Sequence, residues 1–143
     1  IMKIYIAGIV YGSMLDGLGL RTAIFFSGCN VKCEGCHNKE FWNITEGKEF
    51  FIDDLVNEIK NKTPQKKITI TGGEPLEQKE ALIKLIDNLD GFDIGLYTSY
   101  SIDSIEESIL KKLRFIKTGK FEVSKKINHS FYGSSNQNLY FLK

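Results

Sequence analysis

All three cysteines of this 143-residue sequence fall in one short loop, as Cys29, Cys33 and Cys36, with the spacing C-x3-C-x2-C. Thiolates are the preferred ligands of iron–sulfur clusters, and such clusters are normally held by four of them. Three thiolates on one loop can ligate three corners of a 4Fe–4S cluster, which leaves one iron without a protein sulfur. Because an open coordination position can bind a substrate or cofactor, the spacing predicts a reactive cluster.

Three other interpretations of these cysteines remain open. A zinc site of three cysteines and His37 has suitable ligand types, although the adjacent Cys36 and His37 point apart and zinc ligands usually come as pairs from separated segments. A disulfide framework is disfavoured by the odd number of cysteines and by the absence of a visible secretory signal. Three unrelated buried cysteines would be scattered along the chain. The spacing favours the cluster over zinc.

A second motif, Thr71-Gly72-Gly73-Glu74-Pro75, follows a predicted strand. Two glycines let the backbone approach a ligand closely, and the carboxylate of Glu74 could bind an ammonium group. The alternative is an ordinary turn between a strand and a helix, for which glycines and an acidic helix start are common. On its own the motif favours that alternative, but it gains weight because we expect it at the same edge of the sheet as the cysteines.

Apolar and β-branched runs predict the strands that position these motifs. The strands are expected at residues 3–10, 22–26, 67–71, 93–98, 114–117 and 138–142. Apolar residues at helical spacing predict the helices, with Ser101 as the N-cap of the last one. The helices are expected at residues 53–60, about 77–89 and from Ser101 to Leu113. The polar residues 43–48 are expected to form a surface loop.

The alternation of strands and helices predicts one α/β domain, residues 1–143, with a mostly parallel sheet and right-handed crossovers. The strand at residues 22–26 leads directly into the cysteines. The cysteine loop is therefore expected at the C-terminal strand ends, where α/β proteins place their chemistry.

Composition excludes several classes of partner. The formal net charge is +1, so nothing in the charge balance predicts binding to nucleic acid or to an anionic membrane. No apolar run approaches the roughly 20 residues needed to span a bilayer. Reduced thiols and the lack of a visible signal peptide predict a cytoplasmic protein.

With these motifs the sequence resembles the radical S-adenosylmethionine (SAM) enzymes, whose signature is the C-x3-C-x2-C loop accompanied by a GGE motif. The stretch 16–21, running into 25–29, is similar to glycyl-radical-enzyme activases. The segments 119–122 and 133–137 resemble those of activating proteins of anaerobic ribonucleoside-triphosphate reductase, and the match covers nearly the whole chain. Two residues depart from the wider pattern: Leu18 stands where proline is frequent, and Gly35 replaces an aromatic residue, as is common in these activating proteins. The resemblance implies a partial (βα) barrel of the radical SAM type.

The resemblance also implies roles for individual residues. Cys29, Cys33 and Cys36 would ligate the 4Fe–4S cluster, whose open iron binds the amino and carboxylate groups of SAM. One electron would then cleave SAM to methionine and a 5′-deoxyadenosyl radical, which takes a hydrogen atom from a backbone glycine of a partner protein. The residues that would contact SAM are Gly72, Gly73 and Glu74 at its ammonium group, Gly35, Cys36 and His37 at its adenine end, and Thr98 and Lys117 as further candidates. His37 could instead only make a local hydrogen bond, and Lys117 could be a solvated lysine at a strand end.

The partner implied is the large subunit of anaerobic ribonucleotide reductase, with a reduced electron donor such as flavodoxin. Other functions stay open at this point. Within the same chemistry they are a pyruvate formate-lyase-type activase and a 7-carboxy-7-deazaguanine synthase, both of which are usually longer. From a different class comes a non-catalytic zinc or iron–sulfur module.

Overall fold

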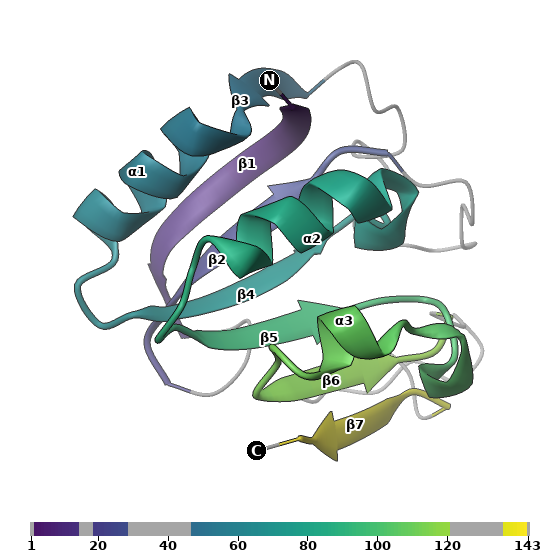
Figure 1. Ribbon diagram of the computed structural model, residues 1–143. Helices are drawn as coiled ribbons and strands as arrows, with labels where there is room; N and C mark the ends of the chain where they lie inside the picture. Colours follow the sequence, from purple (N-terminus) through teal and green to yellow (C-terminus); the bar gives the residue numbers. More distant parts are fainter. Residues whose placement is uncertain (1, 15–18, 29–46, 121–135, 143) are drawn as a thin grey trace.

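The computed structural model describes residues 2–14, 19–28, 47–120 and 136–142 (Figure 1). The cysteine loop, which we define as Cys29 to Cys36, lies outside these ranges, as do His37 and residues 121–135. The described residues include the strand that precedes the cysteine loop and the whole GGE motif.

The described residues form one seven-stranded sheet in the order β3-β1-β2-β4-β5-β6-β7 (Figure 1). In chain order the strands are β1 (Lys3–Ser13), β2 (Arg21–Phe26), β3 (Lys48–Phe51), β4 (Lys67–Gly72), β5 (Asp93–Tyr97), β6 (Phe115–Thr118) and β7 (Asn138–Phe141). Strands β2, β4, β5 and β6 pair in parallel, whereas β1 and β7 run against their neighbours. Five strands therefore share one direction, and the predicted mostly parallel α/β sheet is confirmed.

All six strands predicted from the sequence are present, with small shifts of their ends. The prediction of a surface loop was wrong at its last residue, because β3 begins at Lys48 and pairs with the start of β1. This strand lies at the edge of the sheet, and three of its four residues are exposed. An edge strand with little burial lacks the apolar alternation from which strands are recognised in a sequence.

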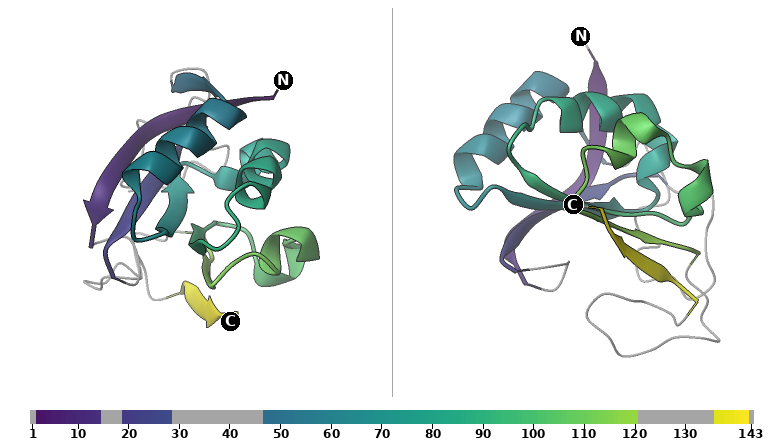
Figure 2. Two further views of the ribbon diagram at one scale, coloured as in Figure 1. Left: turned by 60° about the vertical axis from the view of Figure 1, so that its left-hand side comes forward. Right: turned by 60° about the horizontal axis from the view of Figure 1, so that its bottom comes forward.

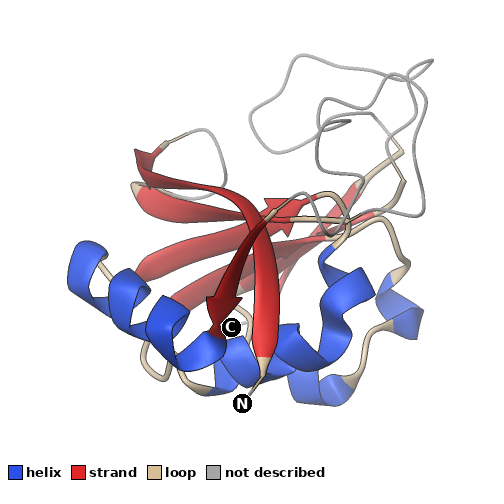
Figure 3. Ribbon diagram, turned by 90° about the horizontal axis from the view of Figure 1, so that it is seen from above, coloured by secondary structure: helices blue, strands red, loops and turns tan. Residues whose placement is uncertain are grey.

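The helices α1 (Ile52–Lys62), α2 (Lys79–Asp87) and α3 (Glu107–Leu110) lie on one face of the sheet (Figures 2 and 3). In α1 the acidic side chains of Asp53 and Asp54 occupy the first turn and Lys60 and Lys62 the last, which complements the helix dipole. The apolar residues of the three helices pack on those of the strands in a single core. Fully buried members of this core include Ile24, Leu55, Ile70, Leu82, Leu96 and Ile109.

The helix predicted from Ser101 to Leu113 is interrupted. A 3-10 turn, η4 (Ile102–Ser104), and the short α3 are separated by extended backbone at Ile105 and Glu106. Ser101 makes no side-chain capping bond, and the Ser104 hydroxyl donates to the Ser101 carbonyl instead (2.8 Å). Such local bonds compete with the helix. Ile105 is nevertheless buried, so the core position was predicted correctly although its helix was not.

The helix predicted at residues 77–89 is divided as well. A 3-10 helix, η3 (Pro75–Gln78), precedes α2. Its last residue, Gln78, is also the N-cap of α2 and has the non-helical angles φ −119° and ψ 48°. The side chain of Gln78 is engaged with β1, as described below, and this anchoring coincides with the change of helix type.

Arg21 joins the parallel strands at the end of β2 remote from the cysteines. Its side chain is fully buried, and it donates to the Thr69 hydroxyl (3.0 Å), to the Ile68 carbonyl (2.8 Å) and to Asp93. The guanidinium carbon lies 4.9 Å from the centroid of the Phe115 ring. A Cβ at Gly95 would overlap that ring, so the neighbouring strand must leave space for it.

None of the helices in the described part of the chain is both long enough and apolar enough to cross a membrane.

Candidate functional site

The two sequence motifs follow the carboxyl ends of neighbouring strands. Strand β2 ends at Phe26, three residues before Cys29, and β4 ends at Gly72. The two strands pair in parallel, with Phe26 opposite Gly72. In α/β proteins this end of the sheet is the usual place for ligands. The pairing therefore places Phe26, three residues before the first cysteine, beside Gly72, the first glycine of the GGE motif.

Backbone hydrogen bonds join the GGE turn to the residues that lead into the cysteines. We call Phe26–Gly28 the lead-in segment. The Gly73 amide donates to the Phe26 carbonyl (3.1 Å), and the Glu74 amide donates to the Gly28 carbonyl (2.7 Å). Gly72 has φ +120°, and a Cβ there would overlap the backbone of Phe26. Glycine is required at this position for both reasons.

The side-chain amide of Gln78 connects the same lead-in segment to β1. Its nitrogen donates to the carbonyls of Tyr5 (2.8 Å) and Ser27 (3.0 Å), and its oxygen accepts from the Tyr5 amide (2.9 Å). The Ser27 amide in turn donates to the Tyr5 carbonyl (3.1 Å). Gln78 is only 8% exposed, so these bonds are largely shielded from water.

Glu74 is fully buried and connects the GGE turn to the end of β5. One carboxylate oxygen accepts from the Ser99 amide (2.7 Å), and the other accepts from the Thr98 hydroxyl (2.8 Å) and the Leu76 amide (2.9 Å). Burial raises the pKa of the Glu74 carboxyl above its ordinary value, and these hydrogen bonds oppose that rise. The Ser99 side chain adds a further hydrogen bond to this carboxyl, so the buried group is held from several sides.

Two candidates remain among the described residues: Thr98 directly follows β5, and Lys117 lies on β6. The Thr98 hydroxyl donates to Glu74 and accepts from the Tyr100 amide (3.2 Å), and the Thr98 amide donates to the Lys117 carbonyl (2.9 Å). The ammonium group of Lys117 lies 4.0 Å from the centroid of the Tyr97 ring, within the range of a cation–π contact. The half-buried Lys117 thus packs against the sheet.

The structure connects Gly72, Gly73, Glu74 and Thr98 in one hydrogen-bonded group at the strand ends and brings the backbone of Lys117 to it. The other candidates, Cys29, Cys33, Gly35, Cys36 and His37, lie outside the described residues.

Sequence reasoning missed Gln78, although a signal was present. The apolar stripe of α2 includes Ala81, Leu82 and Leu85, and Gln78 stands one helical turn before this stripe. An uncharged polar residue that continues a buried stripe needs buried hydrogen-bond partners. That requirement would have marked Gln78 for attention.

Ser27 provides a test of whether this region suits a polar ligand. Its side-chain oxygen is buried and has no hydrogen-bond partner, one of few such atoms in the described part of the protein. An unsatisfied buried hydroxyl costs roughly 1–3 kcal/mol, and a bound polar group could satisfy it. With three thiols beginning two residues later, the donor set fits an iron–sulfur cluster.

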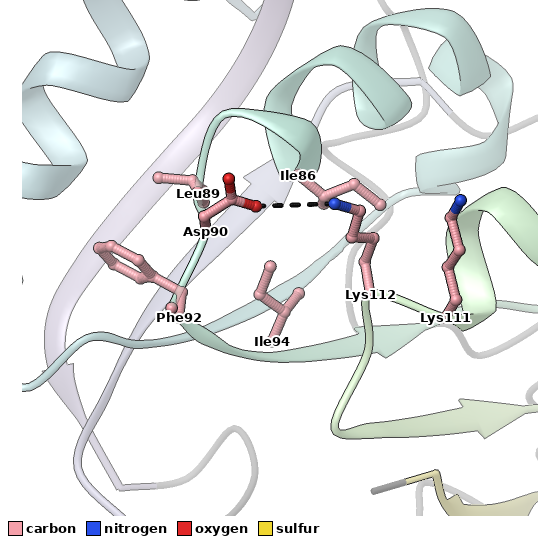
Figure 4. Close-up of a pocket in the computed structure, with 8 residues that line it drawn as sticks. Ile86, Leu89, Asp90, Phe92, Ile94, Lys111 and Lys112 are labelled. Atoms are coloured by element: carbon pink, nitrogen blue, oxygen red, sulfur yellow. Dashed lines mark ion pairs between the residues drawn. The ribbon is translucent and has the colours of Figure 1, made fainter.

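A surface pocket at the opposite end of the sheet is separate from this site (Figure 4). The pocket lies near the amino ends of β5 and β6. It is lined by apolar residues, including Leu89 and Ile94, and by Lys111 and Lys112. Lys112 lies 3.6 Å from the carboxylate of Asp90. The two motifs follow the other ends of the parallel strands, so this pocket takes no part in their chemistry.

The class of protein that combines a parallel α/β core with three cysteines after one strand and a GGE turn after the neighbouring strand is that of iron–sulfur proteins. The chain belongs to the family described as "4Fe-4S single cluster domain", which matches residues 15–140.

The relatives agree with the resemblance predicted from the sequence, which is thereby confirmed. The chain is 32% identical over 136 residues to the anaerobic ribonucleoside-triphosphate reductase-activating protein of Enterobacteria phage T4, covering 88% of this chain and 86% of that protein. It is 28% identical over 144 residues to the protein of the same name from Escherichia coli K12, with 91% and 94% covered. A pyruvate formate-lyase-activating enzyme from Clostridium pasteurianum is 37% identical over 78 residues, covering 51% of this chain and 33% of the enzyme.

Among solved structures, QueE from Escherichia coli has a similar fold. The TM-score is 0.59 and the sequence identity 19%, with 82% of this chain and 70% of QueE covered. At this identity the likeness concerns the fold alone.

Proposed function

We propose that this protein is a radical SAM activase that cleaves SAM reductively at a 4Fe–4S cluster and generates a glycyl radical on anaerobic ribonucleoside-triphosphate reductase. The main structural support is the 2.7 Å hydrogen bond from the Glu74 amide to the Gly28 carbonyl, which ties the GGE turn to the base of the cysteine loop. The names and coverage of the phage and bacterial relatives support the choice of partner.

In this proposal Cys29, Cys33 and Cys36 hold the cluster and leave one iron open to SAM. When bound, the cluster would supply the electron for the reductive cleavage of SAM, from which the glycyl radical of the partner would arise. The contribution of the protein is to position SAM and to shield the site from side reactions.

The SAM contacts are proposed for the GGE turn first. The carbonyls of Gly72 and Gly73 and the carboxylate of Glu74 suit an ammonium group, because hydrogen bonds between a cation and a carboxylate are strong. Thr98 holds the Glu74 carboxylate in place, so its contribution to SAM binding would be largely indirect. Further candidates are Gly35, Cys36 and His37 at the adenine end, and Lys117.

The finer features of the fold and surroundings belong to the same proposal. The sheet would form a partial (βα) barrel with the cysteine loop at its C-terminal strand ends, and a loop of the reductase large subunit would reach the site. A reduced donor such as flavodoxin would supply the electron, in the cytoplasm. All of the described helices cover one face of the sheet (Figure 3). This arrangement supports access of the partner to the site from the opposite face.

Electron paramagnetic resonance (EPR) under anaerobic conditions tests the proposal. The iron-loaded protein is reduced and mixed with SAM and the reductase large subunit, and a glycyl-radical doublet that requires SAM is expected. The Cys29→Ala variant should give neither the doublet nor SAM cleavage. Zinc without sulfide in the purified protein, or SAM cleavage that survives Cys29→Ala, would contradict the proposal. A SAM-sensitive cluster signal without the doublet would contradict only the choice of partner.

A further inference from the structure

We infer that Gln78 is a positioning residue, whose side chain fixes the lead-in segment, and with it the cysteine loop, relative to the GGE turn. The inference rests on the proposed function for the roles of the two motifs, and its own geometry lies wholly within described residues. Nothing in the sequence motifs assigns a role to this glutamine.

The first step of the argument is that Gln78 takes the place of a missing strand residue. Strand β2 ends at Phe26, next to β1, so the backbone of Tyr5 extends beyond the regular pairing of the two strands. The Tyr5 carbonyl receives the Ser27 amide, and the Tyr5 amide donates to the Gln78 oxygen (2.9 Å). Without this acceptor the Tyr5 amide would lack a hydrogen-bond partner, which is costly. The Gln78 side chain therefore continues the hydrogen bonding of β1 beyond the end of β2.

The second step is that one short stretch, residues 73–78, donates hydrogen bonds to all three carbonyls of the lead-in segment. Its carbonyls at Phe26, Ser27 and Gly28 accept from Gly73, Gln78 and Glu74 respectively. Only the Ser27 bond comes from a side chain, and the other two come from backbone amides of the GGE turn. The stretch that would bind SAM therefore also determines where the cysteine loop begins.

The third step is that only glutamine suits the position among side chains of its size. Its amide donates to the Tyr5 and Ser27 carbonyls and accepts from the Tyr5 amide, and a single side chain must do both. Glutamate has no donor when ionised, and methionine offers neither a comparable donor nor a strong acceptor. Groups that hydrogen-bond directly to metal ligands affect metal affinity by about 10–100-fold. Gln78 bonds to Ser27, two residues before the first cysteine, so we expect an effect at the lower end of this range.

The test compares Gln78→Met and Gln78→Glu with the wild type and with Thr63→Val as a matched control. The control removes a buried hydrogen bond, Thr63 to Thr22 (2.7 Å), at the opposite end of β2. Each iron-loaded protein is given excess chelator, and the rate of iron release is followed together with thermal unfolding. The EPR spectrum of the reduced cluster is recorded with and without SAM, in the absence of the reductase.

Gln78→Met should release iron about tenfold faster than the wild type, and SAM should perturb its cluster spectrum less. Gln78→Glu should release iron at least as fast as Gln78→Met, because its carboxylate would face the carbonyls of Tyr5 and Ser27 without a donor for either. Thr63→Val should lose thermal stability yet release iron like the wild type. Release and spectra unchanged in both Gln78 variants would overturn the inference, as would a Thr63→Val variant that loses iron as fast as Gln78→Met.

If Gln78→Met does not fold, Gln78→Glu, which has the same size as the native residue, decides by the same outcomes. Failure of the proposed function would look different. A wild-type protein without a 4Fe–4S cluster would contradict the function itself. A wild-type protein with a SAM-sensitive cluster but no glycyl radical would leave the role of Gln78 intact.

Discussion

At the scale of single residues, Glu74 combines two demands that oppose each other. Its carboxylate is fully buried, which disfavours the ionised form, and it receives hydrogen bonds from Leu76, Thr98 and Ser99, which favour that form. Burial is the larger effect, so the pKa of Glu74 lies above its ordinary value. A buried anion facing the proposed SAM site would be compensated when a cationic ligand arrives.

This balance predicts a pH-dependent stability. Because the pKa is raised on folding, the contribution of Glu74 is most favourable below its unfolded value of 4.5 and is lost as the pH rises through the folded value. Between about pH 8 and about pH 5, the wild type should therefore gain melting temperature relative to Glu74→Gln. The measurement is anaerobic thermal unfolding of the iron-loaded proteins.

The control for this prediction is Glu77→Gln, which removes an exposed carboxylate from the same turn. A difference between wild type and Glu74→Gln that stays constant over the pH range would show that the buried carboxyl does not behave as described.

At the scale of secondary-structure elements, Arg21 connects strands that the sequence predicts one by one, although it does not predict which of them are neighbours in the sheet. It contacts β4 at Thr69 and Ile68, β5 at Asp93 and the Phe115 ring of β6. The Arg21 nitrogen lies 2.6 Å from the Asp93 carboxylate, and the Arg21 side chain is fully buried. This cluster fixes the parallel strands at the end opposite the site.

Arg21→Met should lower the free energy of unfolding by about 3 kcal/mol, because it removes a fully buried guanidinium and leaves the buried Thr69 hydroxyl and Ile68 carbonyl without that donor. Lys79→Met serves as the control, since it breaks an exposed ion pair with Glu106 (2.7 Å) and should change stability little. Urea unfolding monitored by circular dichroism gives both values. Equal effects of the two substitutions would refute a special role for the buried arginine.

The elements also show what the sequence could predict. β-Branched runs such as residues 67–71 gave the strands around the site, and the glycine motif gave the turn. The role of Gln78 depends on the backbone of Tyr5, which is 73 residues away, and no local pattern specifies such a distant pairing. The interrupted helix after Ser101 was missed because the apolar spacing is compatible with a continuous helix and does not register the competing serine bonds.

At the scale of the whole molecule, residues outside the cysteine loop are sufficient to form one apolar core. The core is built from the described sheet and its three covering helices, and the seven strands pair with one another through described residues. The fold should therefore differ from small zinc domains, in which metal binding and folding are one event.

A variant with Cys29, Cys33 and Cys36 all replaced by serine should thus bind no cluster yet keep its secondary structure and unfold cooperatively. Iron analysis, far-ultraviolet circular dichroism and a thermal melt check this expectation. The wild type after iron removal by chelator is the comparison, and the two metal-free proteins should melt alike. Loss of the folded signal in both would mean that the cluster is needed for the fold.

The two strands that run against the rest of the sheet, β1 and β7, place Met2 and Leu142 near opposite ends of the parallel strands. Strand β1 runs against β2, so Met2 and Lys3 lie beside Gln78, with which they share a surface depression. Strand β7 runs against β6, with Phe141 opposite Phe115 at the start of that strand. An affinity tag fused before Met2 would therefore lie near the strand ends that carry the two motifs. The same tag at the carboxyl end would project from the far side, which makes it the better handle for purification and surface immobilisation.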